Sequence, residues 1–443
     1  LEAPAVEAEV TLSRATVDDF EVGDAYLVAR LERENIFVDR LDLMIGERSA
    51  RARGSIGLRD GFPVKAEVEL DAVEFARILD KVGLDHAWVN FEGTGRIEVE
   101  GKLMPFQLTG PLAIDARNFR VYDRGFDRPK PETMLQFDWA RVELTADLNA
   151  ERARLLRGSI RTDRSDIDAD ATLYFDLERG LDIDVALHEL DLGDLGHVVQ
   201  LPWAGRVEGN AKIKGPYGSR IGIEGAIKGR DVQFHKLNLG NVEAQVRFNQ
   251  LVLGFPSINL TKGRSRFWAE GELDLGVDGG PEGRGRGSFD GARLSDLVAI
   301  IGDEHWIFDL LRGRAEARIN GQATVEGRVL APHALIDVSL FDTTYFDRQL
   351  GSGVLAFRAQ DGEVVAIDRL DFDGPCGQLV FSGQVLLSEG LDFQISAPML
   401  FMKELAKPDA EWLETAGTLS AKARLFGPFD HVRMDGSVDA REI

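Results

Sequence analysis

The 443-residue chain contains a single cysteine, Cys376, and the absence of a second thiol excludes two kinds of site. One cysteine can form neither an intrachain disulfide nor a thiolate metal cluster. The seven histidines are scattered, with no HExxH pair and no Cys–His spacing. The sequence therefore predicts no metal site, and we expect no cofactor.

Long apolar runs and a surplus of basic residues are also missing. No segment approaches the roughly 20 apolar residues of a membrane-spanning helix. No signal peptide is recognisable and residue 1 is Leu, so we expect a piece of a longer protein whose anchor lies outside this chain. The formal net charge of −23 opposes binding to nucleic acid, whose affinity depends on basic residues.

Motifs of the common catalytic sites are lacking. The chain has no GxGxxG, GxxxxGK[ST] or GxSxG sequence. The stretch RSDIDAD from Arg164 lacks the glycine and the distal glutamate of a calcium loop. Asp182 and Asp184 fall on the polar phase of a strand, which indicates a solvated surface. We expect no catalytic residues and no enzyme.

A proline-led turn recurs four times, at Pro111, Pro216, Pro332 and Pro428, about 100 residues apart. A run of alternating apolar and polar residues precedes each turn, and another follows it. Proline fixes φ and cannot donate to a ladder, so it belongs at a turn or a strand start. Each copy therefore predicts a β-hairpin with one apolar and one polar face.

Upstream of the hairpins the apolar period changes to that of a helix. The two clear stripes are Phe75, Ile78, Leu79 and Val82, and Leu294, Leu297, Val298 and Ile301. Asp71 and Ser295 are the expected N-caps. Weaker copies begin at Leu190 and Met399. A tryptophan follows each copy, and we interpret these four as buried anchors: Trp88, Trp203, Trp306 and Trp412.

A glycine recurs in the closing strand of the pattern, as Gly54, Gly271 and Gly383, and predicts a bulge or bend. The repeating unit is then five or six strands plus one short amphipathic helix. No Pro/Ser-rich linker separates the units, so we expect one continuous structure. The expected boundaries are 1–62 (the C-terminal half of a repeat), 63–180, 181–283 and 284–388 (full repeats), and 389–443 (an N-terminal half).

This order of elements resembles the AsmA-like superfamily of Gram-negative envelope proteins. The order in this chain is an apolar helix near Asp-Leu, a Gly-Pro hairpin, and a series of glycine-containing strands that ends in GxLxL. Within the superfamily, this order is most similar to the TamB branch, the translocation and assembly module proteins. The resemblance implies a mainly β, elongated repeating β-groove, an incompletely closed β-tube with an apolar trough.

The resemblance also implies a periplasmic protein, held to the inner membrane by a segment outside this chain, that carries phospholipid toward the outer membrane. The expected partners are phospholipid and an Omp85-type outer-membrane barrel protein. An apolar face that short helices cover only in part would expose more apolar surface than a soluble monomer tolerates, and acyl chains can fill it. The helices are expected as plugs or partial lids.

The residues expected to line the groove are the apolar members of the alternating strands that follow the turns. They are Ile221, Ile223, Ile227, Ile336, Val338, Leu340, Val432 and Met434. Two alternatives remain at this point. The same residues are compatible with a dry core without any ligand. A scaffold for outer-membrane protein assembly, acting by strand addition, is favoured if the edge strands are long and free of polar residues.

Overall fold

The computed structural model describes sixteen stretches of the chain. They are residues 6–17, 20–45, 48–76, 89–122, 133–176, 178–194, 202–216, 221–234, 237–277, 280–301, 313–329, 331–360, 364–386, 388–401, 404 and 417–441. Their 25 strands belong to one open antiparallel sheet, which confirms the mainly β class. The contacts divide the chain into unit 1 (Leu1–Ile227 and Phe248–Gln250) and unit 2 (Lys228–Arg247 and Leu251–Ile443).

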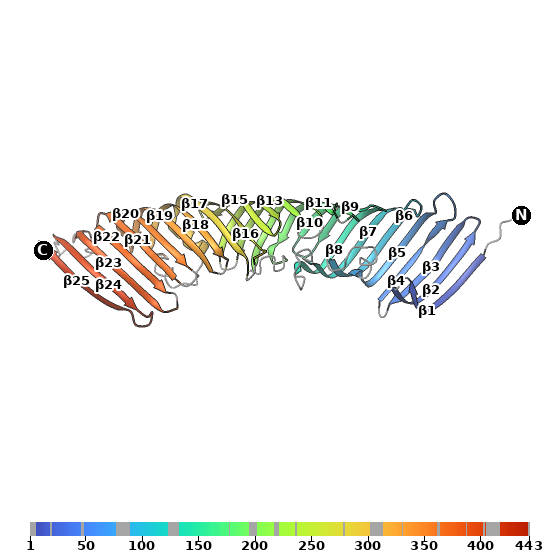
Figure 1. Ribbon diagram of the computed structural model, residues 1–443, viewed down its shortest axis with the longest axis horizontal. Coiled ribbons are helices and arrows are strands. Elements are labelled where there is room, and N and C mark those ends of the chain that lie inside the picture. The colour runs from blue at the N-terminus through green and yellow to red at the C-terminus, as the bar shows by residue number, and fades with distance from the viewer. Residues whose placement is uncertain are drawn as a thin grey trace. The chain divides into compact units, whose positions relative to one another are not determined.

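In unit 1, strands β1 to β12 each pair antiparallel with the next strand along the chain (Figure 1). Their bounds are β1 Val6–Val17, β2 Phe20–Glu32, β3 Asn35–Ile45, β4 Arg48–Gly57, β5 Pro63–Glu74, β6 Val89–Lys102, β7 Gln107–Tyr122, β8 Thr133–Asn149, β9 Arg152–Arg161, β10 Asp166–Tyr174, β11 Leu181–Asp191 and β12 Trp203–Gly215. A 3-10 turn, η2 (Leu192–Asp194), follows β11.

In unit 2, strands β15 to β25 pair in the same consecutive way. Their bounds are β15 Val252–Lys262, β16 Ser265–Asp274, β17 Glu282–Arg293, β18 Ala315–Arg328, β19 Ala331–Tyr345, β20 Arg348–Gln360, β21 Val364–Gly374, β22 Gly377–Leu386, β23 Gly390–Phe401, β24 Thr418–Gly427 and β25 Arg433–Arg441. Helix α2 (Leu294–Ile301) follows β17 directly. Strands β13 (Gly222–Phe234) and β14 (Leu237–Asn249) contribute residues to both units.

Three of the four proline turns fall where the sequence predicts them. Pro332 is the second residue of β19, Pro428 lies in the turn between β24 and β25, and Pro216 follows the last residue of β12. The prediction for Pro111 is wrong, because Gly110 and Pro111 lie inside β7. The β6–β7 pairs skip these two residues, as expected where proline has no N–H to donate.

The predicted helix at residues 294–301 is confirmed as α2. Neither expected cap is one: Asp71 lies within β5, and Ser295 lies inside the first turn of α2. Within the described residues, the weaker copy at Leu190 forms η2, and Met399 belongs to β23. Ile78, Leu79 and Val82, and the tryptophans Trp88, Trp306 and Trp412, lie outside the described residues.

The predicted bulges are confirmed, and they lie on the strands opposite the repeating glycines. Gly54, Gly271 and Gly383 are each the last partner before a register shift in the preceding strand. A Cβ at Gly54 would lie 2.3 Å from the carbonyl oxygen of Lys65. These positions need glycine because the neighbouring backbone approaches so closely.

Among the described residues, no helix has the length and apolar character that crossing a membrane requires.

Candidate functional site: the apolar face of the sheet

The register of the strands aligns apolar side chains into rows that cross each unit. Residues directly opposite each other in antiparallel strands point to the same face of a sheet. The Leu70 row of unit 1 consists of Leu12, Ala25, Leu43, Ala50, Leu70, Gly95, Ile114, Val142, Ile160, Ile167, Leu187 and Gly209. Every strand from β1 to β12 thus contributes an apolar residue or a glycine to one continuous row.

Unit 2 contains two such rows, each running through every strand from β15 to β25. The Val338 row consists of Leu260, Phe267, Phe289, Gly321, Val338, Leu355, Leu370, Phe381, Ile395, Ala423 and Gly436. The Ile336 row consists of Ile258, Ala269, Gly287, Ala323, Ile336, Phe357, Ile367, Gly383, Phe393, Leu425 and Met434. Neither row is interrupted by a polar side chain.

The opposite face of the sheet carries paired charges. In unit 1, Arg53 and Arg96 both contact Glu67 from neighbouring strands, at 2.6 and 2.8 Å. In unit 2, Arg286 pairs with Glu270 at 2.6 Å, and Arg424 with Asp392 at 2.7 Å. The guanidinium of Arg424 lowers the pKa of Asp392 by hydrogen bonding. This face is therefore satisfied by cross-strand ion pairs and water.

Many residues of the apolar rows are only half-buried, although their strands are fully paired. In the Ile336 row, Ile336, Phe357, Ile367, Phe393 and Leu425 are all in this class. Soluble monomers rarely leave contiguous apolar patches of this extent exposed. The Ile336 row is therefore a partly exposed apolar surface rather than a closed core.

Helix α2 lies on the apolar face and covers one part of the Val338 row. Ile300 of α2 joins a buried cluster with Phe267, Ile319, Val338 and Leu340. Leu294 and Leu297 of the helix pack against the same cluster. The apolar stripe of α2 thus replaces water over β16 to β19, where Ile319 is completely buried.

A serine at the start of β16 fastens the first turn of α2. The Ser265 hydroxyl donates to the Asp296 carboxylate (2.7 Å), and the Arg264 amide donates to the same oxygen (3.1 Å). Ser265 Oγ in turn accepts from the Arg293 amide (2.8 Å). We call Ser265, Asp296 and these bonds the serine latch. It satisfies a buried hydroxyl and holds the beginning of the helix against the β15–β16 turn.

The same arrangement recurs in unit 1. The Ser165 hydroxyl donates to Asp194 in η2 (2.8 Å), and the Asp191 amide donates to Ser165 Oγ (3.1 Å). In unit 2, Cys376 occupies the corresponding place at the start of β22, and its thiol contacts the Glu404 carbonyl (3.9 Å). Burial, and then the charge of Glu404, raise the pKa of Cys376.

The structure distributes the predicted lining residues over both units. Val338 and Leu340 are buried in the cluster under α2, and Ile336 packs against it. Met434 belongs to the Ile336 row on β25 and is 73% exposed. Val432 lies just before β25, is exposed, and is not part of a row.

The remaining three predicted residues lie in unit 1. Ile227 extends the Leu70 row, because a Cβ at Gly209 would lie 2.9 Å from the Ile227 Cα. Ile223 has the same strand phase as Ile227 and is half-buried. Ile221 precedes β13 and is also half-buried.

Sequence reasoning missed the serine latch. Ser165 and Ser265 stand at equivalent positions and make the same kind of bond, to Asp194 and Asp296. An Arg-Ser pair stands at the start of the strand in both copies, and Asp194 and Asp296 follow at similar distances. The signal was present, but a recurring pair separated by about 30 residues has no meaning until pairing brings its members together.

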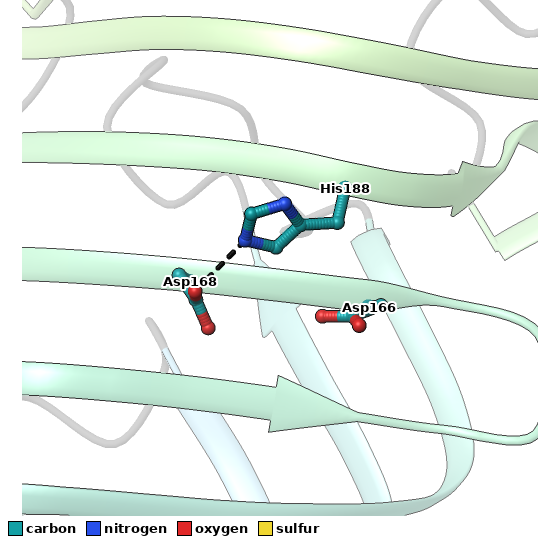
Figure 2. Close-up of side chains that lie close together, drawn as sticks. All are labelled: Asp166, Asp168 and His188. Atoms are coloured by element: carbon teal, nitrogen blue, oxygen red, sulfur yellow. Dashed lines mark hydrogen bonds and ion pairs between the residues drawn. The ribbon is translucent and has the colours of Figure 1, made fainter.

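Figure 2 shows the one group of acidic and imidazole side chains, within the described part of the chain, that is close enough to hold a metal ion. His188 Nε2 lies 2.8 Å from Asp168, and Asp166 lies on the same strand as Asp168. The Arg161 guanidinium contacts Asp166 at 2.6 Å and Asp168 at 2.9 Å. The positive charge of Arg161 thus already neutralises both carboxylates. The group is an ion-pair network of the charged face.

A hollow of about 660 Å³ lies over β9 to β13 of unit 1, and it differs from the apolar rows in character. Its lining includes Arg157, Asp168, Asp184 and Lys212, and Lys212 pairs with Asp184 at 2.9 Å. Paired charges of this kind disfavour a hydrocarbon ligand.

The fold and the site together define an open antiparallel sheet with one charged face and one apolar face. No family model, curated protein or solved structure matches the chain.

Proposed function

We propose that the apolar face binds the acyl chains of phospholipid and conducts them along the sheet. The observation that supports this proposal is the unbroken sequence of apolar residues and glycines in the Leu70, Ile336 and Val338 rows. One residue per strand at a spacing of about 4.8 Å gives a hydrocarbon chain a continuous apolar path.

The physics of transfer fits such a path. Each methylene that leaves water for the apolar face gains about 0.8 kcal/mol. A chain that advances by one strand exchanges apolar contacts for contacts of the same kind, so the gain changes little from step to step. Movement along the row therefore needs no specific contact, whereas a charge in the row would raise a barrier.

The rival role, strand addition to a client protein, receives less support from β25, the last of the described strands. It pairs with β24. It carries Arg433, Asp435, Asp439 and Arg441, together with a glycine. Charged side chains on an edge strand oppose pairing with another chain.

The compartment and the partners come from the resemblance to AsmA-like proteins. On that basis we propose a segment of a bridge that carries phospholipid through the periplasm between the inner and outer membranes. Its anchor in the inner membrane and its contact with an Omp85-type barrel then belong to parts outside this chain.

A matched pair of substitutions on β19 tests the proposal. Ile336 lies in an apolar row, while its neighbour Leu335 lies on the charged face opposite Arg358 and is 54% exposed. We expect Ile336→Asp to abolish transfer of fluorescent phospholipid between donor and acceptor vesicles, and Leu335→Asp to leave it unchanged. Native mass spectrometry of the purified wild type should detect bound phospholipid.

Equal transfer by both variants and the wild type would contradict the path along the row. A wild-type preparation that neither carries nor takes up phospholipid would overturn the proposed function altogether.

A further inference from the structure

Helix α2 is held in two different ways at its two ends. At the first turn, Asp296 accepts hydrogen bonds from Ser265 and from the Arg264 amide, and β17 continues into the helix without a linker. At the last turn, Ile300 is buried against Ile319, Val338 and Leu340. Polar bonds thus reinforce the apolar contact of Leu294 at the beginning of the helix, whereas Ile300 holds its end by apolar contacts.

These two kinds of contact respond differently to a hydrocarbon ligand. An acyl chain can replace the contacts of Ile300, because methylene groups pack against Ile319 and Val338 as an isoleucine does. It cannot replace the bonds of the serine latch, because it has no donor or acceptor for Ser265 or Asp296. A ligand entering under the helix therefore loosens only its last turn.

The repetition of the latch supports a role beyond the packing of one helix. Ser165 and Asp194 form the same bond in unit 1, where the Arg164 side chain also binds Asp194. The serine hydroxyl and its acid are thus kept in both units, together with the arginine that precedes the serine. The contact that recurs in both units is therefore the polar one, which holds the beginning of α2 in unit 2 and η2 in unit 1.

We propose that α2 is a flap hinged at the serine latch, whose last turn lifts from the apolar face when an acyl chain passes beneath it. The inference rests on the proposed function and adds a gate to it. When closed, α2 covers the Val338 row, and when its last turn lifts, the row becomes accessible while the first turn stays bound to the sheet. The occupant is the hydrocarbon chain of a phospholipid, the same ligand that the rows accept.

Pulsed electron paramagnetic resonance between pairs of spin labels tests the hinge in the full chain. The background is Cys376→Ser, which installs the residue found at the equivalent positions 165 and 265. One pair joins Ala299→Cys, exposed in the last turn, to Thr324→Cys, exposed on the charged face of β18. The control pair joins Ser295→Cys, exposed in the first turn, to the same Thr324→Cys.

With vesicles of phosphatidylethanolamine and phosphatidylglycerol, we expect the 299–324 distance to gain a population longer by about 4 Å, the thickness of one hydrocarbon layer in contact. The 295–324 distance should stay unchanged. In Asp296→Asn, which keeps the shape of the side chain but removes its charge, the 295–324 distance should lengthen as well.

Native mass spectrometry of the same samples separates the two proposals. Bound phospholipid with no change in either distance would show a fixed α2 and overturn the flap, while the lipid-binding function stands. Equal lengthening of both distances would show that the helix leaves as a whole and overturn the hinge. The absence of bound phospholipid would overturn the proposed function and the flap with it.

Discussion

Two parts of the Val338 row differ in burial although their residues are equally apolar. Over β16 to β19, where α2 lies on the face, Phe267 is 7% and Val338 6% exposed. Farther along the same row, Phe381 and Ile395 are half-buried, and no helix of the described residues packs over them. Cover by a helix, and not the hydrophobicity of the side chain, decides which part of the row is a core and which part is a surface.

The largest effect is expected from a substitution in the part of the apolar face that α2 covers. Ile319→Ala leaves a cavity under α2, because the side chain is completely buried. We expect a loss of about 2–5 kcal/mol in the free energy of unfolding of unit 2. The same change at half-buried Ile395 should cost only about 1 kcal/mol, since less apolar area is lost. Hydrogen exchange of the unit 2 amides measures both, and equal costs would remove the distinction between the two parts.

A second substitution tests what holds the uncovered part together. Gly383 of the Ile336 row has a φ of +149°, and a Cβ there would lie 2.2 Å from the Asp392 carbonyl oxygen. We expect Gly383→Ala to cost about 1–3 kcal/mol through backbone displacement. Gly254→Ala is the control, because its nearest contact would be an ordinary 3.6 Å. Urea denaturation followed by circular dichroism compares the two, and similar midpoints would contradict the role assigned to Gly383.

A substitution in the serine latch tests how α2 is held on the covered part of the Val338 row. Ser265→Ala removes the donor to Asp296 and the acceptor of the Arg293 amide. We expect a loss of about 1–3 kcal/mol, with faster exchange of the α2 amides than of the β20–β23 amides. Ser288→Ala, at an exposed position on the charged face of β17, is the matched control. Uniform acceleration across unit 2 would argue against a local latch.

The smallest expected effect concerns the charged face. Hydrogen bonds from His188 and then Arg161 lower the pKa of Asp168. A lowered pKa contributes stability above the unfolded-state value of about 3.9, and this contribution is lost as the pH falls through the folded-state value. The wild type should therefore exceed Asp168→Asn slightly in urea midpoint at about pH 6 and lose that advantage below about pH 3. A constant difference at both values would show that the ion pairs do not stabilise the fold.

Much of the fold was predictable, because strand alternation is a local property of the sequence. The hairpins at Pro332 and Pro428 and the helix at residue 294 followed from the period of the apolar residues. Pro111 was misplaced because its hairpin turns earlier, and a proline inside a strand looks the same in sequence as one at a turn. The groove-lining role of Ile336 and Met434 remains a prediction. That the two residues share one row could not be predicted from the sequence, because they lie about 100 residues apart and only strand pairing connects them.

The sequence by itself determined that each strand has one apolar and one charged face, because side chains alternate with a period of two wherever the backbone is extended. Only the tertiary structure decided which residues share a row, since bulges opposite Gly54, Gly271 and Gly383 shift the register in ways no local pattern records. It also decided that Ser265 meets Asp296, because that bond depends on the pairing of β16 with β17 and on the direction in which the chain enters α2.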